Sequence, residues 1–224
     1  MEQQTDKPTS YGEQVTNRLR ELILGGEYEP EQQLKEVELA ERLGVSRSPI
    51  KIALTMLASE GLVTIVPHRG AVAVKFTPDR AIELYELRDA IECKSVELAS
   101  ERGSLEEIDR LAETLDRAQA EARDSSAYPA EHDFHMPIVL MTGNRQLITV
   151  ARNLLAQTQL ARSRSSSAPG RAAHALIEHQ EILEKIRNRD AAGAVAAMRA
   201  HLQRSRENVL ELLGNEQGPG PARS

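Results

Sequence analysis

The part of the chain that decides the fold is residues 34–70, LKEVELAERLGVSRSPIKIALTMLASEGLVTIVPHRG. Apolar residues recur at helical spacing over residues 36–43 and again from Ile50 to Leu57, and Gly44 lies between the two runs. Beyond them, the β-branched residues of LVTIV and AVAVKF flank the turn PHRG, which predicts a β-hairpin. The stretch therefore predicts two short helices, a tight turn and a two-stranded wing.

Positive charge gathers in the second half of this stretch, although the chain of 224 residues has a formal net charge of −6. Residues 42–75 contain one anionic side chain, Glu60, and five cationic ones: Arg42, Arg47, Lys51, Arg69 and Lys75. A local reversal of charge of this kind suits a surface that contacts phosphate. The aromatic content is 3% and there is no Trp, which argues against a stacking platform for single strands. We therefore expect double-stranded DNA as the partner.

The start of the second helix carries side chains that the major groove of DNA can admit. Arg47 can form two hydrogen bonds with a guanine or a phosphate, and Lys51 lies one turn further along the same helix face. The neighbouring serines can donate to phosphates, and the tip of the hairpin can enter the adjacent minor groove. The alternative is a solvated basic face that binds nothing. The residues predicted to contact DNA are Ser46, Arg47, Ser48, Lys51, His68, Arg69 and Gly70.

Composition and the distribution of apolar residues predict the organisation of the whole chain. With 40% hydrophobic residues the chain can bury a core, and no run reaches the roughly 18 apolar residues of a membrane helix. The N-terminus lacks the regions of a signal peptide, and Cys93 is the only cysteine, so we expect a cytoplasmic protein with no internal disulfide and no membrane partner. The predicted parts are a disordered arm 1–10, a DNA-binding domain 11–77, a helical domain 78–214 and a disordered tail 215–224.

Beyond Thr77-Pro78-Asp79 the apolar period becomes helical, and no strand signal follows. Ser104 with Glu107 forms a capping-box signature, and Asp190 is a suitable N-cap. The sequence therefore predicts a mainly α fold, in which the second domain is an all-α, six-helix antiparallel bundle. The predicted helices span 79–101, 104–123, 129–141, 145–166, 171–189 and 190–213.

Histidines occupy positions in the helical domain where apolar residues are expected. His179 lies on the inward stripe of the fifth predicted helix, and His201 lies on that of the sixth. Glu131 and His135 are spaced i and i+4, on one face of a single helix, although Pro137 is expected to interrupt that helix. Three imidazoles and a carboxylate that point into a bundle are what a divalent metal such as zinc requires. The alternative for each histidine is a hydrogen-bonded core residue.

At these residues the chain resembles regulators of the GntR superfamily, bacterial transcription factors with a winged helix-turn-helix domain. The resemblance covers residues 11–76 and rests on LRELILGGEYEP, LKEVELAERLGVSRSP, ALTMLASEGLV and PHRGAVAV. It implies that Arg47 and its neighbours contact DNA together with the wing residues near Arg69. Family members usually carry Arg-Glu where this chain has Lys51-Ile52, so a point charge replaces a bidentate group and an acidic partner is absent.

The second domain resembles the all-helical FCD ligand-binding domain of FadR-type GntR regulators, and its helix count resembles their VanR-like subgroup. The matching segments are YELRDAIECKSVELA, FHMPIVLMTGN and EHQEILEKIRNRDAAGAVAAMRAHL. In that family the metal ligands are an aspartate four residues before a histidine, that histidine and two later histidines. The resemblance implies zinc, or alternatively nickel or manganese, with Glu in place of the usual Asp. The implied ligands are Glu131, His135, His179 and His201.

The resemblance also implies an effector, a small carboxylate that completes the open coordination positions of the metal. Arg88 on the first bundle helix is expected to hold the far end of this acid through a bidentate contact. The alternative for Arg88 is an ion pair with Glu92 at i+4. Asn144 is the other residue expected at the effector site, and its alternative role is to cap a helix.

These features predict a homodimeric transcription regulator, usually a repressor in this family, which binds an inverted-repeat operator and responds to the acid. Two alternatives stay open. In the first, a DNA-binding regulator carries the metal in a purely structural role and has no effector. The second is a metal-dependent hydrolase, because three histidines and a carboxylate with an open position also describe catalytic zinc. His132-Asp133 even resembles the dyad of HD-type phosphohydrolases.

Overall fold

The computed structural model of the protein describes residues 11–122, 133–165 and 171–216. The chain folds into two compact units that divide between Phe76 and Thr77. We call them the winged unit and the helical unit. The predicted arm, residues 1–10, lies outside the described residues, and so does the chain beyond residue 216.

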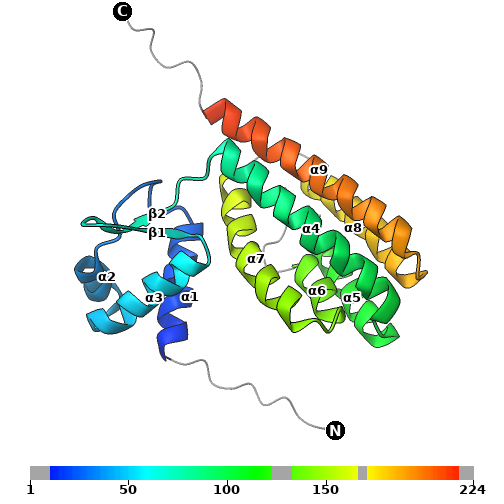
Figure 1. Ribbon diagram of the computed structural model, residues 1–224, viewed down its shortest axis with the longest axis horizontal. Helices are drawn as coiled ribbons and strands as arrows, with labels where there is room; N and C mark the ends of the chain where they lie inside the picture. Colours follow the sequence, from blue (N-terminus) through cyan, green and yellow to red (C-terminus); the bar gives the residue numbers. More distant parts are fainter. Residues whose placement is uncertain (1–10, 123–132, 166–170, 217–224) are drawn as a thin grey trace, which may run out of the picture. The chain divides into compact units, whose positions relative to one another are not determined.

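The winged unit has the predicted helix-turn-helix and hairpin, labelled in Figure 1. The two strands are antiparallel, in a register that runs from Val63 opposite Ala73 to Val66 opposite Gly70. Gly44 follows α2 with a φ of +66°, a conformation that costs a residue without a Cβ little, and it thereby permits the tight turn into α3. The elements are α1 (Tyr11–Leu24), α2 (Glu36–Leu43), α3 (Arg47–Ser59), β1 (Val63–Val66) and β2 (Gly70–Ala73).

One face of α3 forms the core of the winged unit together with α1. Its buried apolar residues recur three and four positions apart, and α3 packs against α1 through them. Arg20 of α1 donates to both carboxylate oxygens of Glu60, at 2.8 and 2.6 Å, just beyond the end of α3. This packing fixes which face of α3 points away from the core. The buried residues of α3 are Ile50, Ala53, Leu54 and Leu57.

The helical unit is formed by helices α4 to α9 in the residues that the structure describes, which confirms the predicted mainly α fold (Figure 1). Helix α4 is central, because α9 lies along it and both α6 and α7 pack against it. None of the described helices is long and apolar enough to cross a membrane. The bounds are α4 (Pro78–Arg102), α5 (Leu105–Ala122), α6 (His135–Met141), α7 (Arg145–Ser165), α8 (Arg171–Arg187) and α9 (Ala191–Glu216).

The caps expected in this unit are confirmed. The hydroxyl of Ser104 accepts a hydrogen bond from the backbone N–H of Glu107 at 3.2 Å, and the Glu107 carboxylate accepts one from the N–H of Ser104 at 2.9 Å. Asp190 accepts from the N–H of Gly193 at 2.9 Å in the first turn of α9. These bonds satisfy N–H groups that have no partner inside their own helix.

The start of the third predicted helix of this unit is wrong. The prediction began at residue 129, whereas Asp133 and Phe134 are not helical and α6 begins at His135. The Asp133 carboxylate accepts from the N–H groups of His135 and Met136, at 3.0 and 3.2 Å, and thereby caps the start of α6. Pro137 lies in the first turn, where no intrahelical N–H bond is lost, and therefore does not interrupt α6.

Candidate functional site

Three histidine side chains from three helices converge in the interior of the helical unit. His135 begins α6, His179 lies on α8 and His201 on α9, and their exposed fractions are 9%, 0% and 1%. Their ring centroids are 4.7 to 5.2 Å apart, and one nitrogen of each ring lies within 4.8 Å of the others. Phe134 stacks on His179, with centroids 4.2 Å apart. The three predicted histidines are therefore brought together.

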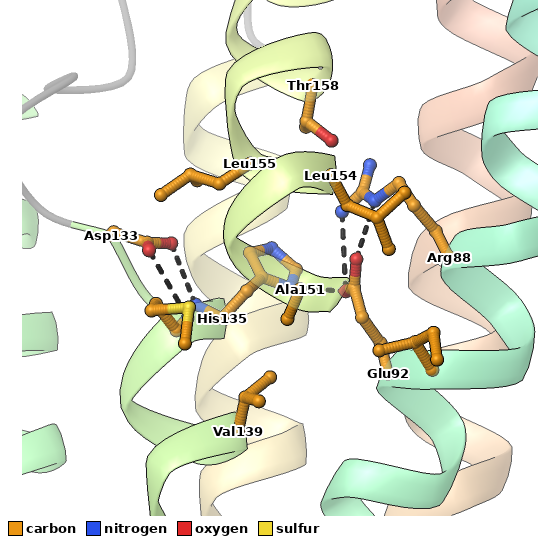
Figure 2. Close-up of a pocket in the computed structure, with 11 residues that line it drawn as sticks. Arg88, Glu92, Asp133, His135, Val139, Ala151, Leu154, Leu155 and Thr158 are labelled. Carbon is orange, nitrogen blue, oxygen red and sulfur yellow. Dashed lines mark hydrogen bonds and ion pairs between the residues drawn. The ribbon is translucent and has the colours of Figure 1, made fainter. Parts of the chain in front are cut away.

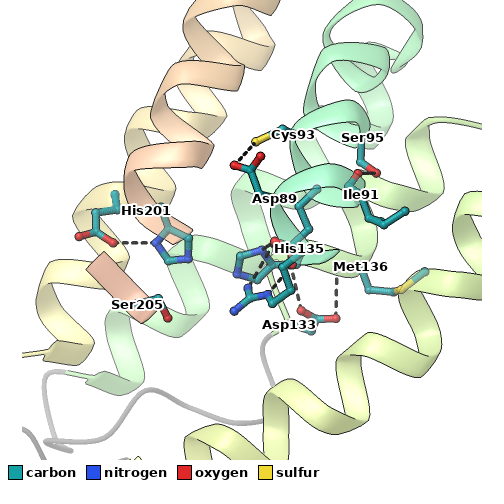
Figure 3. Close-up of polar contacts among 12 residues, drawn as sticks. Asp89, Ile91, Cys93, Ser95, Asp133, His135, Met136, His201 and Ser205 are labelled. Atoms are coloured by element: carbon teal, nitrogen blue, oxygen red, sulfur yellow. Dashed lines mark hydrogen bonds and ion pairs between the residues drawn. The ribbon is translucent and has the colours of Figure 1, made fainter. Parts of the chain in front are cut away.

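Two of these rings are held by buried carboxylates. Nδ1 of His135 lies 2.6 Å from Oε2 of Glu92, which comes from α4. Nδ1 of His201 lies 2.6 Å from Oε2 of Glu178, which comes from α8. The side chains of His201 and His135 are labelled in Figure 3. A carboxylate on one ring nitrogen fixes the tautomer and the orientation of a metal-binding histidine.

The opposite nitrogens of these two rings are suited to hold a metal. In His201, the hydrogen bond between Nδ1 and Glu178 keeps the ring proton on Nδ1 and leaves the lone pair on Nε2. Nε2 of His201 is buried and has no hydrogen-bond partner among the described residues, and both ring nitrogens of His135 are buried without one, although Nδ1 lies beside Glu92. Burial lowers the pKa of His201 to about 3, although Glu178 opposes the shift, so the ring is neutral near pH 7. Neutral imidazoles with buried lone pairs fit a divalent ion and could bind one.

The fourth predicted ligand, Glu131, lies outside the described residues, and its role stays a prediction. The expectation that it shares a helix face with His135 is not supported by α6, which begins at His135 itself. Asp133 is the described carboxylate that precedes this histidine. On a continuous helix, residues two apart point in different directions, but Asp133 is not helical, and its carboxylate folds back over the first turn of α6 (Figure 3).

A small cavity, about 30 Å³ in volume, lies beside His135 and is bounded by α4, α6 and α7 (Figure 2). Most of its wall is apolar, and a few polar side chains reach into it from the three helices, as expected for a ligand site. Its polar lining consists of Arg88, Glu92, Asp133, His135 and Thr158. Its apolar lining consists of Ile91, Met136, Val139, Ala151, Leu154 and Leu155.

Arg88 forms the ion pair that its spacing predicts and also lines the cavity. Its Nε donates to Oε1 of Glu92 at 2.6 Å, and its guanidinium lies 4.9 Å from the centre of the Tyr85 ring. Nη1 of Arg88 is buried and has no hydrogen-bond partner among the described residues. Burial works against ionisation of Glu92, but the positive charge of Arg88, together with the contact with His135, overcomes it and holds the pKa of Glu92 well below its usual range. The pair therefore stays ionised.

Asn144, the other predicted effector residue, caps a helix. Its Oδ1 accepts from the backbone N–H groups of Gln146 and Leu147, at 3.0 and 3.3 Å, at the start of α7. It is not among the residues that line the cavity. The structure therefore brings Arg88 to the cavity but does not bring Asn144 there.

The predicted DNA contacts on α3 are exposed. Ser46 is the N-cap residue and its hydroxyl makes no capping hydrogen bond. Arg47 begins the helix, and its guanidinium lies 3.2 Å from a carboxylate oxygen of Glu36, in an ion pair open to solvent. Ser48 and Lys51 follow on the face of α3 that points away from the core. Surface ion pairs are weak, so Arg47 can exchange its partner for a phosphate or a base.

The predicted contacts in the wing are exposed as well. His68 and Arg69 lie in the turn between β1 and β2, and Gly70 is the first residue of β2. Gly70 has a φ of +77° and His68 one of +61°, so the turn uses the left-handed region twice. Nη2 of Arg69 donates to the backbone carbonyl of Glu31 at 3.0 Å, which ties the tip to the loop before α2.

The sequence reasoning missed two features of the site. These are Glu178 as a site residue and the contact of Glu92 with His135. Glu178 precedes His179 in the chain, but it faces His201 on the next helix and also lies 3.2 Å from Arg204. A signal existed, because an acidic residue next to the apolar stripe of a helix needs a partner when it is buried. Which histidine it meets depends on how α8 packs against α9.

Known proteins that are similar to this chain show which family it belongs to. Residues 11–72 match the family described as bacterial regulatory proteins, gntR family, and residues 83–204 match the FCD domain. A similar protein is the HTH-type transcriptional regulator YdhC of Bacillus subtilis, 27% identical over 93% of this chain and 95% of its own. The Nta operon transcriptional regulator of Aminobacter aminovorans is 30% identical over 83% and 88%. The structure of E. coli McbR/YncC has a TM-score of 0.76 at 20% identity, and covers 93% of this chain and 99% of its own.

The chain therefore belongs to the GntR family of DNA-binding transcriptional regulators, in the branch that carries an FCD domain. Its relatives are regulators and not enzymes, so the hydrolase alternative is excluded. The His132-Asp133 pair, which resembles the dyad of HD-type phosphohydrolases, adds no support for that alternative. His132 lies outside the described residues, and the Asp133 carboxylate is bonded to backbone N–H groups.

Replacing Glu92 tests the buried pair. Glu92→Gln leaves the guanidinium of Arg88, which is 1% exposed, without a counter-charge, so we expect the free energy of unfolding to fall by ~3–5 kcal/mol. The matched control is Glu97→Gln on the same helix, which breaks a solvent-exposed pair with Lys94 and should cost at most ~1 kcal/mol. Urea unfolding in the presence of chelator measures both. Equal losses in the two variants would contradict the assigned pair.

Proposed function

We propose that this regulator binds an inverted-repeat operator as a homodimer and releases it when a small carboxylate binds beside a metal in the helical unit. The observation that carries the proposal is the trio His135, His179 and His201, buried next to a cavity that contains an ionised Arg88–Glu92 pair. The exposed cationic face of α3 supplies the DNA-binding half of the argument.

Helix α3 enters the major groove, and its first turn contacts phosphates and base edges. Arg47 and Lys51 supply the charge, and the wing residues near Arg69 contact the adjacent minor groove. In a two-fold symmetric dimer the two α3 helices meet half-sites one DNA turn, ~34 Å, apart, which is why the operator is an inverted repeat. Following the resemblance to its family, the bound protein acts as a repressor.

The metal site uses the three histidines together with a carboxylate, Glu131 or in its place Asp133. A divalent ion bound there, zinc or else nickel or manganese, supplies positive charge and open coordination positions for an anion. Three neutral imidazoles and one carboxylate leave a net positive charge on the ion. The Arg88–Glu92 pair adds none, so an anionic ligand balances the site better than a neutral one.

The effector is a small organic acid, because the cavity beside His135 has a small volume. Its carboxylate lies at the metal, and its far end meets Arg88, whose buried Nη1 supports this role, and the hydroxyl of Thr158. A cavity of about 30 Å³ holds a water molecule or two, so an acid with several carbon atoms must move the apolar side chains of α7 outward. Binding of the acid is thereby coupled to a movement of helices.

The coupling passes through α4. This helix carries Arg88 and Glu92, packs against α6 and α7, and begins at Pro78, two residues after the winged unit ends. A movement of α7 that changes the direction or the rigidity of α4 changes how α3 is presented to DNA. A coupling free energy of ~1–3 kcal/mol lowers operator affinity 5- to 150-fold. The second candidate is a metal with a purely structural role, for which acids have no effect.

Charge removal on α3 tests the DNA-binding step. We expect Arg47→Ala to weaken binding to the chain's own upstream DNA and to reduce the slope of log K against log salt by ~0.9 if Arg47 contacts one phosphate. The control is Arg18→Ala on α1, which removes an equally exposed arginine that also pairs with a glutamate. Fluorescence anisotropy at several salt concentrations measures both. Equal effects of the two variants would place the interface elsewhere.

Metal content and its dependence on Glu178 test the metal step. We expect one divalent ion per chain by elemental analysis, and Glu178→Gln should weaken its binding ~10- to 100-fold because the ring of His201 loses its carboxylate partner. Glu181→Gln makes the same charge change at an exposed position on the same helix and should leave affinity unchanged. A competition titration with a chromophoric chelator gives both affinities. Protein that retains no ion without chelator would contradict this step.

A panel of small carboxylates, each with its matching amide, tests the sensing step. We expect one or more acids, and not their amides, to lower operator affinity 5- to 150-fold, and chelator to abolish this response. Thr158→Val should weaken the response, whereas Thr149→Val, an exposed threonine on the same helix, should not. Acids without effect on metal-loaded protein would favour the purely structural metal.

A further inference from the structure

The exposed face of α3 contains a large apolar residue at its centre. Ser48, Ile52 and Thr55 follow one another at spacings of four and three, so they lie on one face of the helix, opposite the buried Ile50, Leu54 and Leu57. Ile52 is 54% exposed. Packing of the core therefore does not require an apolar residue at position 52.

The neighbours of Ile52 leave its branched side chain facing outward. Met56, the other apolar residue exposed on α3, lies against the core, since its sulfur is 3.6 Å from the hydroxyl of Thr16 on α1. Thr55 donates its hydroxyl to the backbone carbonyl of Lys51 at 2.9 Å, which turns its polar atom onto the helix. The result is an apolar spot around Ile52, flanked by the cationic side chains of Lys51 and Arg47.

The floor of the major groove offers one apolar group, the C5-methyl of thymine. The polar groups that distinguish the base pairs there are hydrogen-bond donors and acceptors, which lose water without compensation under an aliphatic side chain. The flanking cations suit the phosphates on either side of the groove. We infer that Ile52 is a specificity-determining residue that contacts the C5-methyl of one thymine in each operator half-site. The inference rests on the proposed entry of α3 into the major groove.

The inference predicts that removing one methyl group from the DNA lowers its affinity for the protein. Deoxyuridine pairs like thymidine but lacks the C5-methyl, so its use at the contacted position removes the contact and leaves the hydrogen-bonding pattern intact. Burial of a methyl-sized group contributes ~0.8 kcal/mol, which corresponds to about a fourfold loss of affinity for one half-site. Substitution in both half-sites should give about a fifteenfold loss, if the two contributions add.

The test uses the full-length protein and a duplex that it selects from a random library. Each thymine of the selected duplex is replaced in turn by deoxyuridine, and affinities are measured for the wild type and for Ile52→Ala. Alanine has a high helix propensity, so this variant keeps α3 intact. The control is Ile65→Ala, which truncates an isoleucine of the same 54% exposed fraction on β1 of the wing. The C5-methyl lies in the major groove, so loss of a wing contact in the minor groove does not change the ratio of the affinities for the thymine-containing and the deoxyuridine-containing duplex.

We expect one thymine per half-site at which the wild type and Ile65→Ala discriminate against deoxyuridine and Ile52→Ala does not. A second selection with Ile52→Ala should then relax the base preference at that position alone. The inference is overturned if no position discriminates in the wild type, or if discrimination survives in Ile52→Ala. A salt-sensitive specific complex that lacks discrimination overturns this inference only. Failure to select any duplex overturns the proposed function along with it.

Discussion

The helical unit depends on one constraint, which is that charged and polar groups buried among its helices must have partners. Glu92 meets this constraint twice, since its carboxylate neutralises Arg88 and lies against the ring of His135. The carboxylate of Glu178 lies against the ring of His201 in the same way. A helical bundle with an entirely apolar interior would be simpler to stabilise, because a buried ion pair is no more stabilising than well-packed apolar side chains. These groups therefore point to a function rather than to stability.

These partners hold the interior in an arrangement that suits the proposed response to an effector. The rings of His135 and His201 each lie against a carboxylate through Nδ1, and the cavity beside His135 shares its wall with the Arg88–Glu92 pair. A ligand that enters there meets an imidazole and a fixed cation within one small space. The same space is lined by apolar side chains of α7, so the cavity is in direct contact with the helix that moves in the proposed mechanism.

The two units use cations in opposite ways. Arg88 is 1% exposed and locked to a buried carboxylate, whereas the side chain of Arg47 is 67% exposed and pairs with Glu36 in solvent. The first arrangement orients a charge at a site from which water is largely excluded. The second leaves a charge free to exchange partners when DNA approaches, because a surface ion pair contributes little free energy. Burial thus separates a residue suited to hold a small anion from one suited to contact a phosphate backbone.

The sequence by itself determined the winged module, most of the helix bounds and the identity of the three histidines. Local signals suffice for these features: the spacing of apolar residues, Gly44 at the tight turn, and the capping pair Ser104 and Glu107. Only the tertiary structure decided which carboxylate meets which ring, because Glu92 with His135 and Glu178 with His201 depend on packing between helices distant in the chain. It also moved the start of α6 to His135, since the Asp133 carboxylate competes with continued helix by binding backbone N–H groups.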